Sequence, residues 1–165
     1  HRWRYLFWNS KKKTASLISS CCALGASASN VSEDKIIQFA NFGEKIGIAF
    51  QLKDDLFDYG NKKIGKPTGI DLKEKKLTLP VIYSLNNSST SKKRWLINCI
   101  KNHNDDKKVV KEVIKYVKES GGIDYTISKL KLFQKEALEC LNEYPDNQYK
   151  KSLIKLVNYV IEREY

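Results

Sequence analysis

The sequence predicts an all-α protein, and three observations lead to this prediction. Apolar residues recur at helical spacing along most of the 165 residues, as Val113 and Val117 do. No stretch shows the alternation of apolar and polar residues that marks a half-buried strand. Helix-breaking residues, such as Gly121-Gly122 and Pro145, stand between the periodic stretches. The expected architecture is therefore a helical bundle.

The first two helices are expected in the N-terminal part of the chain. A helix rich in Ala, Ser and Cys is expected to end near Ala26. Ser32 followed by two acidic residues is typical of a helix start, and Gly60 is typical of a helix end. A second helix is therefore expected over about 33–60. The apolar run before Ala26 is shorter than the roughly 20 residues that a membrane-spanning helix needs.

A loop and five shorter helices are expected to follow. The stretch 61–75 is rich in Gly and Lys, which predicts a loop, and it is long enough to be functional. Thr78 is expected to cap a helix that has Pro80 in its first turn and extends to about Leu85. Periodic apolar residues predict the remaining helices over about 91–102, 106–119, 123–143 and 147–163.

The charge of the chain raises the question of nucleic-acid binding, because the formal net charge is +11. The basic residues are 26 Lys and 4 Arg, without the mixture of Arg and aromatic residues that is typical of base recognition. We therefore expect no nucleic-acid partner. The four cysteines show no spacing typical of a zinc site, and unpaired cysteines suit a cytoplasmic protein.

Three carboxylates lie close together at Asp54, Asp55 and Asp58. Read as a helix, Asp54 and Asp58 share one stripe with Gly47 and Gln51, and Asp55 lies beside it. Aspartates at i, i+4 in the last turn repel each other and face the negative end of the helix dipole, at about 0.3–1 kcal/mol each. A hard cation such as Mg²⁺ is expected to offset this cost and to keep positions open for phosphate oxygens. Taken alone, the aspartates also suit a solvated acidic helix end.

The aspartates belong to a longer series of motifs. The motifs FQxxDD and DDxxD are preceded by a KTA segment and followed by three further motifs. In chain order the series is Lys13-Thr14-Ala15, Gln51 to Asp58, Gly65-Lys66, Gly69-x-Asp71 and Lys76-x-Thr78-Leu79-Pro80. The motifs from Gln51 onward closely resemble the second aspartate-rich region of the trans-isoprenyl diphosphate synthases, or polyprenyl synthetases, and the upstream segment resembles the KTA segment of the same family. The resemblance implies an incomplete helical bundle of the isoprenoid synthase type, with residues 1–165 as the C-terminal part of a single domain.

The resemblance also implies an activity. Polyprenyl synthetases are prenyltransferases of isoprenoid biosynthesis, which condense isopentenyl diphosphate head to tail with an allylic diphosphate to give a linear polyprenyl diphosphate. The first aspartate-rich motif of the family has no counterpart here, so the chain alone is expected to be inactive without the missing N-terminal half. A homodimer is the expected assembly.

The resemblance assigns roles to residues that interact with metal and diphosphate. Asp54 is expected to ligate Mg²⁺ directly, whereas Asp55 and Asp58 are expected to act through water or to orient it. Three lysines match family lysines that contact the allylic diphosphate, namely Lys13, Lys66 and Lys76. Each offers a compact cation suited to a phosphate oxygen.

The remaining assigned residues concern the prenyl chain. Thr14 and Gln51 are expected beside the reacting carbons, where their oxygen dipoles stabilise positive charge. Gly47 is expected to leave room for the prenyl chain, and Phe50 to line the cavity. Without the N-terminal half, Gly47, Phe50 and the face of residues 15–26 are expected to be open to water unless a second chain covers them.

Three other functions remain open on the sequence. A class I terpene cyclase shares the ionisation chemistry, although Gln51 and the lysine-rich motifs favour a synthase. A non-catalytic helical subunit and a membrane-surface partner of a prenyl synthase, using its basic helices, are the alternatives from other classes. A DDxxD motif upstream of this sequence would favour the enzyme.

Overall fold

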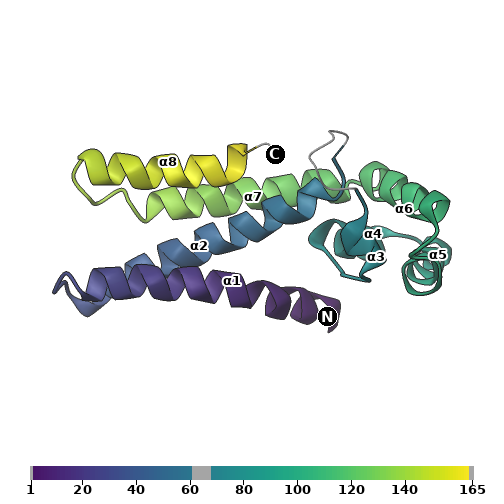
Figure 1. Ribbon diagram of the computed structural model, residues 1–165, viewed down its shortest axis with the longest axis horizontal. Helices are drawn as coiled ribbons and strands as arrows, with labels where there is room; N and C mark the ends of the chain where they lie inside the picture. The colour runs from purple at the N-terminus through teal and green to yellow at the C-terminus, as the bar shows by residue number, and fades with distance from the viewer. Residues whose placement is uncertain (1, 61–67, 164–165) are drawn as a thin grey trace. The chain divides into compact units, whose positions relative to one another are not determined.

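The computed structural model describes residues 2–60 and 68–163, with side chains from Lys13 onward (Figure 1). The described residues form helices and turns and contain no strand, which confirms the all-α prediction. The helices found among them are α1 (Arg2–Ser27), α2 (Glu33–Phe57), α3 (Ile70–Lys73), α4 (Leu79–Asn87), α5 (Thr90–Asn102), α6 (Lys107–Glu119), α7 (Gly122–Glu139) and α8 (Gln148–Glu162).

The chain divides into two compact units, and the boundaries after Phe7, Lys53 and Ser128 fall inside α1, α2 and α7. One unit is made mainly of Asp54–Ser128 and contains α3 to α6; we call it the short-helix unit. The other consists of Trp8–Lys53 and Lys129–Glu164 and contains most of α1, α2 and α7 together with α8; we call it the long-helix unit. That the chain is part of a single domain stays a prediction.

The short-helix unit is built around one apolar core. Helices α4, α5 and α6 pack against one another, and side chains from each of them are buried in the core. Leu96 of α5 and Val117 of α6 are completely buried. The side chain of Asp106 caps α6 by accepting hydrogen bonds from the backbone N–H groups of Lys108 and Val109. The core cluster consists of Tyr59, Leu72, Val81, Leu85, Leu96, Cys99, Ile100, Val110, Val113 and Val117.

The predicted helices are present, and some of them end at other residues than predicted. The second helix stops at Phe57 and not at Gly60, because Tyr59 and Gly60 donate their N–H groups to Leu56 and Phe57 in tight turns. The loop prediction for 61–75 is wrong over Ile70–Lys73, which forms α3. The remainder of that stretch up to residue 67 lies outside the described residues.

In the long-helix unit, α1 lies against α2 at two glycines (Figure 1). A Cβ added at Gly47 would be 2.6 Å from the Ala15 Cα, and one at Gly43 would be 2.7 Å from the Ile18 carbonyl oxygen. Glycine is therefore required for this close approach of the two backbones. The Ser19 hydroxyl adds a hydrogen bond of 2.8 Å to the Ala40 carbonyl.

This contact corrects the expectation that Gly47 and the face of residues 15–26 would be open. Gly47, Ala15 and Ala26 are buried, because α1 itself covers this part of α2. The open side of α1 is a different one, on which Leu17 and Leu24 are 65% and 69% exposed. Phe50 is half-buried.

Polar contacts join the other helices of the long-helix unit. Helices α7 and α8 lie side by side, and the Gln134 amide donates a hydrogen bond of 3.0 Å to the Asn158 side chain (Figure 1). Lys45 of α2 forms an ion pair of 2.6 Å with Glu136 of α7. Glu143, beyond the end of α7, pairs with Lys35.

Candidate active site

The three aspartates lie in different surroundings at the end of α2. Asp54 is exposed, whereas Asp55 and Asp58 are buried. Asp58 follows the last helical residue, Phe57, so it does not continue the helical stripe on which the sequence placed it. Of the three, only Asp54 presents its carboxylate to solvent.

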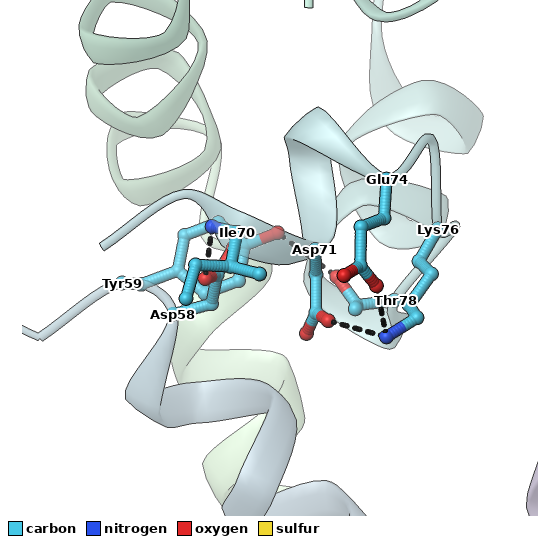
Figure 2. A network of polar contacts seen from close by, with 7 residues as sticks. All are labelled: Asp58, Tyr59, Ile70, Asp71, Glu74, Lys76 and Thr78. Carbon is cyan, nitrogen blue, oxygen red and sulfur yellow. Dashed lines mark hydrogen bonds and ion pairs between the residues drawn. The ribbon is translucent and has the colours of Figure 1, made fainter. Parts of the chain in front are cut away.

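Asp58 forms hydrogen bonds with the segment that begins at Gly69 (Figure 2). Its Oδ1 accepts a hydrogen bond of 2.7 Å from the Ile70 N–H, and its carbonyl oxygen accepts one of 3.1 Å from the Gly69 N–H. Its Oδ2 is buried and has no hydrogen-bond partner among the described residues. Burial, and then the negative charge of Asp71, raise the pKa of the Asp58 carboxyl, while backbone N–H groups of α3 act in the opposite direction.

Gly69 adopts a conformation that few other residues tolerate. Its φ is +82°, in the left-handed region, and a Cβ there would lie 2.6 Å from the Val110 Cγ1. Gly69 is the N-cap residue of α3 but has no side chain that could cap it. The Asp58 carboxylate, from the end of α2, supplies the missing acceptor.

Tyr59 makes a second connection between α2 and the segment after α3. Its hydroxyl lies 2.9 Å from the Thr78 Oγ1, and both side chains are buried. Burial raises the pKa of Tyr59. Thr78 is the N-cap residue of α4, as predicted, but its hydroxyl does not cap that helix, because it pairs with Tyr59. Pro80 stands in the first turn of α4, as predicted.

Lys76 projects from the same segment and is 59% exposed (Figure 2). Its Nζ lies 2.5 Å from Glu74 Oε2 and 3.3 Å from Asp71 Oδ1. The hydrogen bond with Glu74, followed by that with Asp71, raises the pKa of Lys76 despite partial burial. Lys76 is therefore a cation whose charge is already balanced by two carboxylates.

The other predicted site residues that the structure describes belong to the long-helix unit. Lys13 is exposed, and Thr14 and Gln51 are half-buried. Because Ala15 fills the space beside Gly47, the structure shows Gly47 as a packing residue, and its contact with a prenyl chain stays a prediction. Lys66 lies outside the described residues.

Several of the residues that make these contacts were not predicted from the sequence. Tyr59 directly follows the DDxxD motif and is aromatic, which is a signal that could have identified it. Arg163, at the end of α8, is buried, with its guanidinium carbon 3.9 Å from the centre of the Phe50 ring and its Nη2 donating to the Phe50 carbonyl. No local pattern in the sequence predicts that pairing. Glu74 is one acidic residue in a lysine-rich stretch and carries no signal of its own.

A hard divalent cation fits the chemistry of the aspartates, whose oxygens are the donors it prefers. The buried Oδ2 of Asp58, without a hydrogen-bond partner among the described residues and close to the charge of Asp71, lies in a region that a cation would stabilise. Within residues 2–60 and 68–163, however, no three His, Cys, Asp or Glu side chains form a group that could hold a metal ion. The described residues therefore offer oxygen donors that suit a hard cation but do not by themselves make up a complete set of ligands.

The comparisons with known proteins point to one family. The family model described as Polyprenyl synthetase matches residues 4–117. Heptaprenyl diphosphate synthase component 2 of Bacillus subtilis is 30% identical over 157 residues, which are 94% of this chain and 44% of that protein. The short chain isoprenyl diphosphate synthase of Methanothermobacter thermautotrophicus is 31% identical over 156 residues, or 93% of this chain and 47% of that protein.

Solved structures give the same result. A geranylgeranyl pyrophosphate synthase from Bacteroides thetaiotaomicron superimposes with a TM-score of 0.87 at 33% identity, over 96% of this chain and 53% of that chain. A polyprenyl synthase from Caulobacter crescentus, complexed with calcium and isoprenyl diphosphate, superimposes with a TM-score of 0.82 at 26% identity, over 93% of this chain and 47% of that chain. The chain thus spans about half the length of the relatives it matches. No helix in the described part of the chain is long and apolar enough to cross a membrane.

Proposed function

This chain belongs to the polyprenyl synthetase family, and from that membership we propose that it forms the part of a prenyltransferase that carries the second aspartate-rich motif. The reaction is the condensation of isopentenyl diphosphate with an allylic diphosphate. The allylic C–O bond breaks, and pyrophosphate leaves with the bonding electron pair. The double bond of isopentenyl diphosphate attacks the allylic carbocation, a C–C bond forms and a proton is lost, which gives a linear polyprenyl diphosphate.

The observation that carries this proposal is the composition of the short-helix unit around the end of α2. It combines the exposed carboxylate of Asp54, two buried carboxylates and the exposed ammonium of Lys76. Such a combination of charges suits a diphosphate that arrives with divalent cations. The Caulobacter crescentus relative is a complex with calcium and isoprenyl diphosphate, which supports the same ligand class.

The proposed roles of individual residues come from the resemblance to the family, and the exposure of Asp54 supports its role as the direct ligand. Asp54 offers the oxygen that is free to face a cation, while the buried Asp55 and Asp58 act behind it. Lys76 supplies positive charge to the departing diphosphate, together with Lys13 and Lys66. Bound Mg²⁺ would supply Lewis-acid stabilisation of the leaving pyrophosphate.

Two further residues act on the carbocation. The side-chain oxygens of Thr14 and Gln51 orient negative ends of dipoles toward developing positive charge. Phe50, which Arg163 covers on one face of its ring, supports the wall of the prenyl site. The activity needs the remaining half of the domain, and we propose that the complete protein is a cytoplasmic homodimer with peripheral membrane contact.

The kinetic test uses the complete synthase with isopentenyl diphosphate and an allylic diphosphate. Asp54→Ala should reduce kcat by about 10²-fold or more, because an electrostatic contribution to the transition state is lost. Asp105→Ala is a matched control, since Asp105 is also an exposed aspartate of the short-helix unit and lies outside the motifs. Equal losses from the two variants, or a product that is not a linear polyprenyl diphosphate, would contradict the proposal.

A binding test uses the 165-residue chain itself. Calorimetry should detect Mg²⁺ only when pyrophosphate is also present, because the carboxylates alone offer too few ligands. Asp54→Ala should abolish this joint binding. Binding that is unaffected by Asp54→Ala would rule out Asp54 as the metal ligand.

A further inference from the structure

We propose that Asp58 and Tyr59 are positioning residues that fasten the segment Ile70–Thr78, and with it Lys76, to the end of α2. We call the two contacts Asp58–Ile70 and Tyr59–Thr78 the α2 clamp. The inference deepens the proposed function and rests on it in one respect, since Lys76 is taken to bind the diphosphate. It assigns to Asp58 a task other than ligating metal.

The first contact of the α2 clamp fixes the start of the segment. Asp58 uses both its side chain and its main chain, since Oδ1 accepts from the Ile70 N–H at 2.7 Å and the carbonyl oxygen accepts from the Gly69 N–H at 3.1 Å. The N–H groups at the start of a helix need acceptors, and Gly69 cannot provide one from a side chain. Asp58 is 8% exposed, so water does not readily replace it.

The second contact fixes the end of the segment. The Tyr59 and Thr78 side chains are 3% and 4% exposed, and their hydroxyl oxygens lie 2.9 Å apart. A buried hydroxyl without a partner is costly, so each of the two side chains determines the orientation of the other. Because Asp58 and Tyr59 are adjacent in sequence, both ends of the segment are attached at one point of the chain.

Contacts within the segment transmit this attachment to Lys76. The Lys76 N–H donates to the Asp71 carbonyl oxygen at 2.8 Å, and the Lys76 ammonium pairs with the side chains of Asp71 and Glu74 (Figure 2). The main chain and the side chain of Lys76 are thus both held by residues that lie between the two clamp contacts. The α2 clamp therefore keeps Lys76 in a fixed position relative to Asp54, at the end of α2.

A conservative substitution separates this task from metal ligation. In Asp58→Asn, the amide oxygen can still accept from the Ile70 N–H, but the charge that a divalent cation requires is gone. If Asp58 positions the segment, Asn should replace it well and Ala should not. If Asp58 is a metal ligand, Asn and Ala should be equally damaging.

The first experiment tests the α2 clamp by a measurement that does not depend on enzymatic activity. Backbone hydrogen exchange of the 165-residue chain should show protected amides at Gly69 and Ile70. Asp58→Ala should accelerate exchange at Ile70 by about tenfold, the effect of losing one hydrogen bond to a charged acceptor, and Asp58→Asn should restore most of the protection. Unchanged protection in Asp58→Ala would overturn the proposal.

The second experiment uses the complete synthase and separates KM from kcat. Asp58→Ala and Tyr59→Phe should raise the KM for the allylic diphosphate and leave the Mg²⁺ concentration for half-activation unchanged. Thr78→Val should match Tyr59→Phe, and the double variant should be no worse than either single variant, because the two hydroxyls act as one unit. The control is Tyr149→Phe, a tyrosine that is exposed on α8.

The two experiments distinguish a failure of the α2 clamp proposal from a failure of the proposed function. The positioning role would be overturned if the Asp58→Asn variant loses as much activity as the Asp58→Ala variant and needs a higher Mg²⁺ concentration for half-activation. Additive effects of Tyr59→Phe and Thr78→Val would show that the second contact does not act as described. If the wild-type complete protein makes no polyprenyl diphosphate, the proposed function fails, whereas the exchange data on Ile70 still decide whether the clamp exists.

Discussion

The short-helix and long-helix units are stabilised in different ways. The short-helix unit has a cluster of buried apolar side chains, the buried hydroxyl pair Tyr59–Thr78 and the partly buried pair Ser84–Ser120. The long-helix unit also buries apolar side chains, such as Phe42, Leu52 and Leu141, and its long helices meet in addition at glycines and through ion pairs near the surface. Its helices also leave large apolar side chains exposed, namely Leu17, Leu24, Leu132, Leu156, Tyr149 and Tyr159.

This difference indicates which unit depends on other parts of the protein. Both units bury apolar side chains, but the exposed large apolar residues in the described part of the chain belong to the long-helix unit, and an apolar helix face open to water is typical of a surface that another segment or subunit covers. We therefore expect the short-helix unit to be the more self-sufficient of the two. The relatives, of whose length this chain spans about half, contain additional chain that could cover such a face.

The largest expected effect tests the core of the short-helix unit. Leu96 is fully buried, so Leu96→Ala should lower the free energy of unfolding by about 2–5 kcal/mol, through lost burial and a new cavity. Urea denaturation followed by circular dichroism measures the change. Leu24→Ala, at an exposed leucine of the long-helix unit, should change it by less than about 0.5 kcal/mol. A similar loss at both leucines would remove the distinction between the units.

The next effect concerns the contact between α1 and α2. Gly47→Ala should destabilise the long-helix unit by about 1–3 kcal/mol, since the added methyl group would meet the Ala15 backbone, which cannot rotate away. Gly25→Ala is the matched control within a helix, because no atom lies within 4 Å of the position of its Cβ. That control should stabilise the protein by about 0.5–1 kcal/mol, as expected for Ala in a helix. Thermal unfolding of the two variants compares them directly.

A smaller effect is expected on self-association. The isolated chain should bind a hydrophobic dye and scatter light as an oligomer, because Leu17 and Leu24 share an exposed face of α1. Replacing both leucines by glutamine should reduce dye binding and association. Ser20→Gln, also at an exposed position of α1, serves as the control. A wild-type monomer that binds no dye, and that does not change when the additional chain of the proposed complete synthase is supplied, would show that the long-helix unit needs no cover.

The smallest expected effect is a pH dependence of the stability of the long-helix unit. Hydrogen bonds from Lys35 and Gln38 lower the pKa of Glu143 below its usual 4.5. A carboxyl whose pKa is lower in the folded than in the unfolded state stabilises the fold above its usual pKa, and this contribution disappears as the pH falls through the lowered value. Urea midpoints should therefore differ slightly between wild type and Glu143→Gln at pH 7 and converge in acid. A difference between the two urea midpoints that grows in acid would contradict the predicted direction of the pH dependence.

The sequence predicted the helices well, because their signals are local. Periodic apolar residues placed α5, α6 and α8 within one residue at most of their ends. Two features of α4 were also predicted, namely Pro80 in its first turn and Thr78 at its N-cap. The hydroxyl of Thr78 was assigned wrongly, since nothing near it in sequence reveals that Tyr59 will be its partner.

Contacts between distant residues account for the other differences. Helix α3 was missed because its start depends on the Asp58 carboxylate, which reaches it from the end of another helix. The packing of Ala15 beside Gly47 joins residues of two different helices, and no local pattern reveals it; the contact of Gly47 with a prenyl chain stays a prediction. The resemblance to the synthases identified the aspartates and Lys76 as site candidates, but it did not reveal which carboxylates are buried and which one faces solvent.

The ion pairs of Lys76 have a consequence for the choice among anions. With Asp71 and Glu74, the ammonium forms a group of three charges whose sum is one negative charge, so this group repels simple anions. A chloride or acetate ion offers a single charge and cannot replace two carboxylates. A diphosphate offers several oxygens at once and can displace them when cations accompany it. At the proposed diphosphate site we therefore expect discrimination by valence, and buffer anions should compete poorly with the proposed substrate even at high concentration.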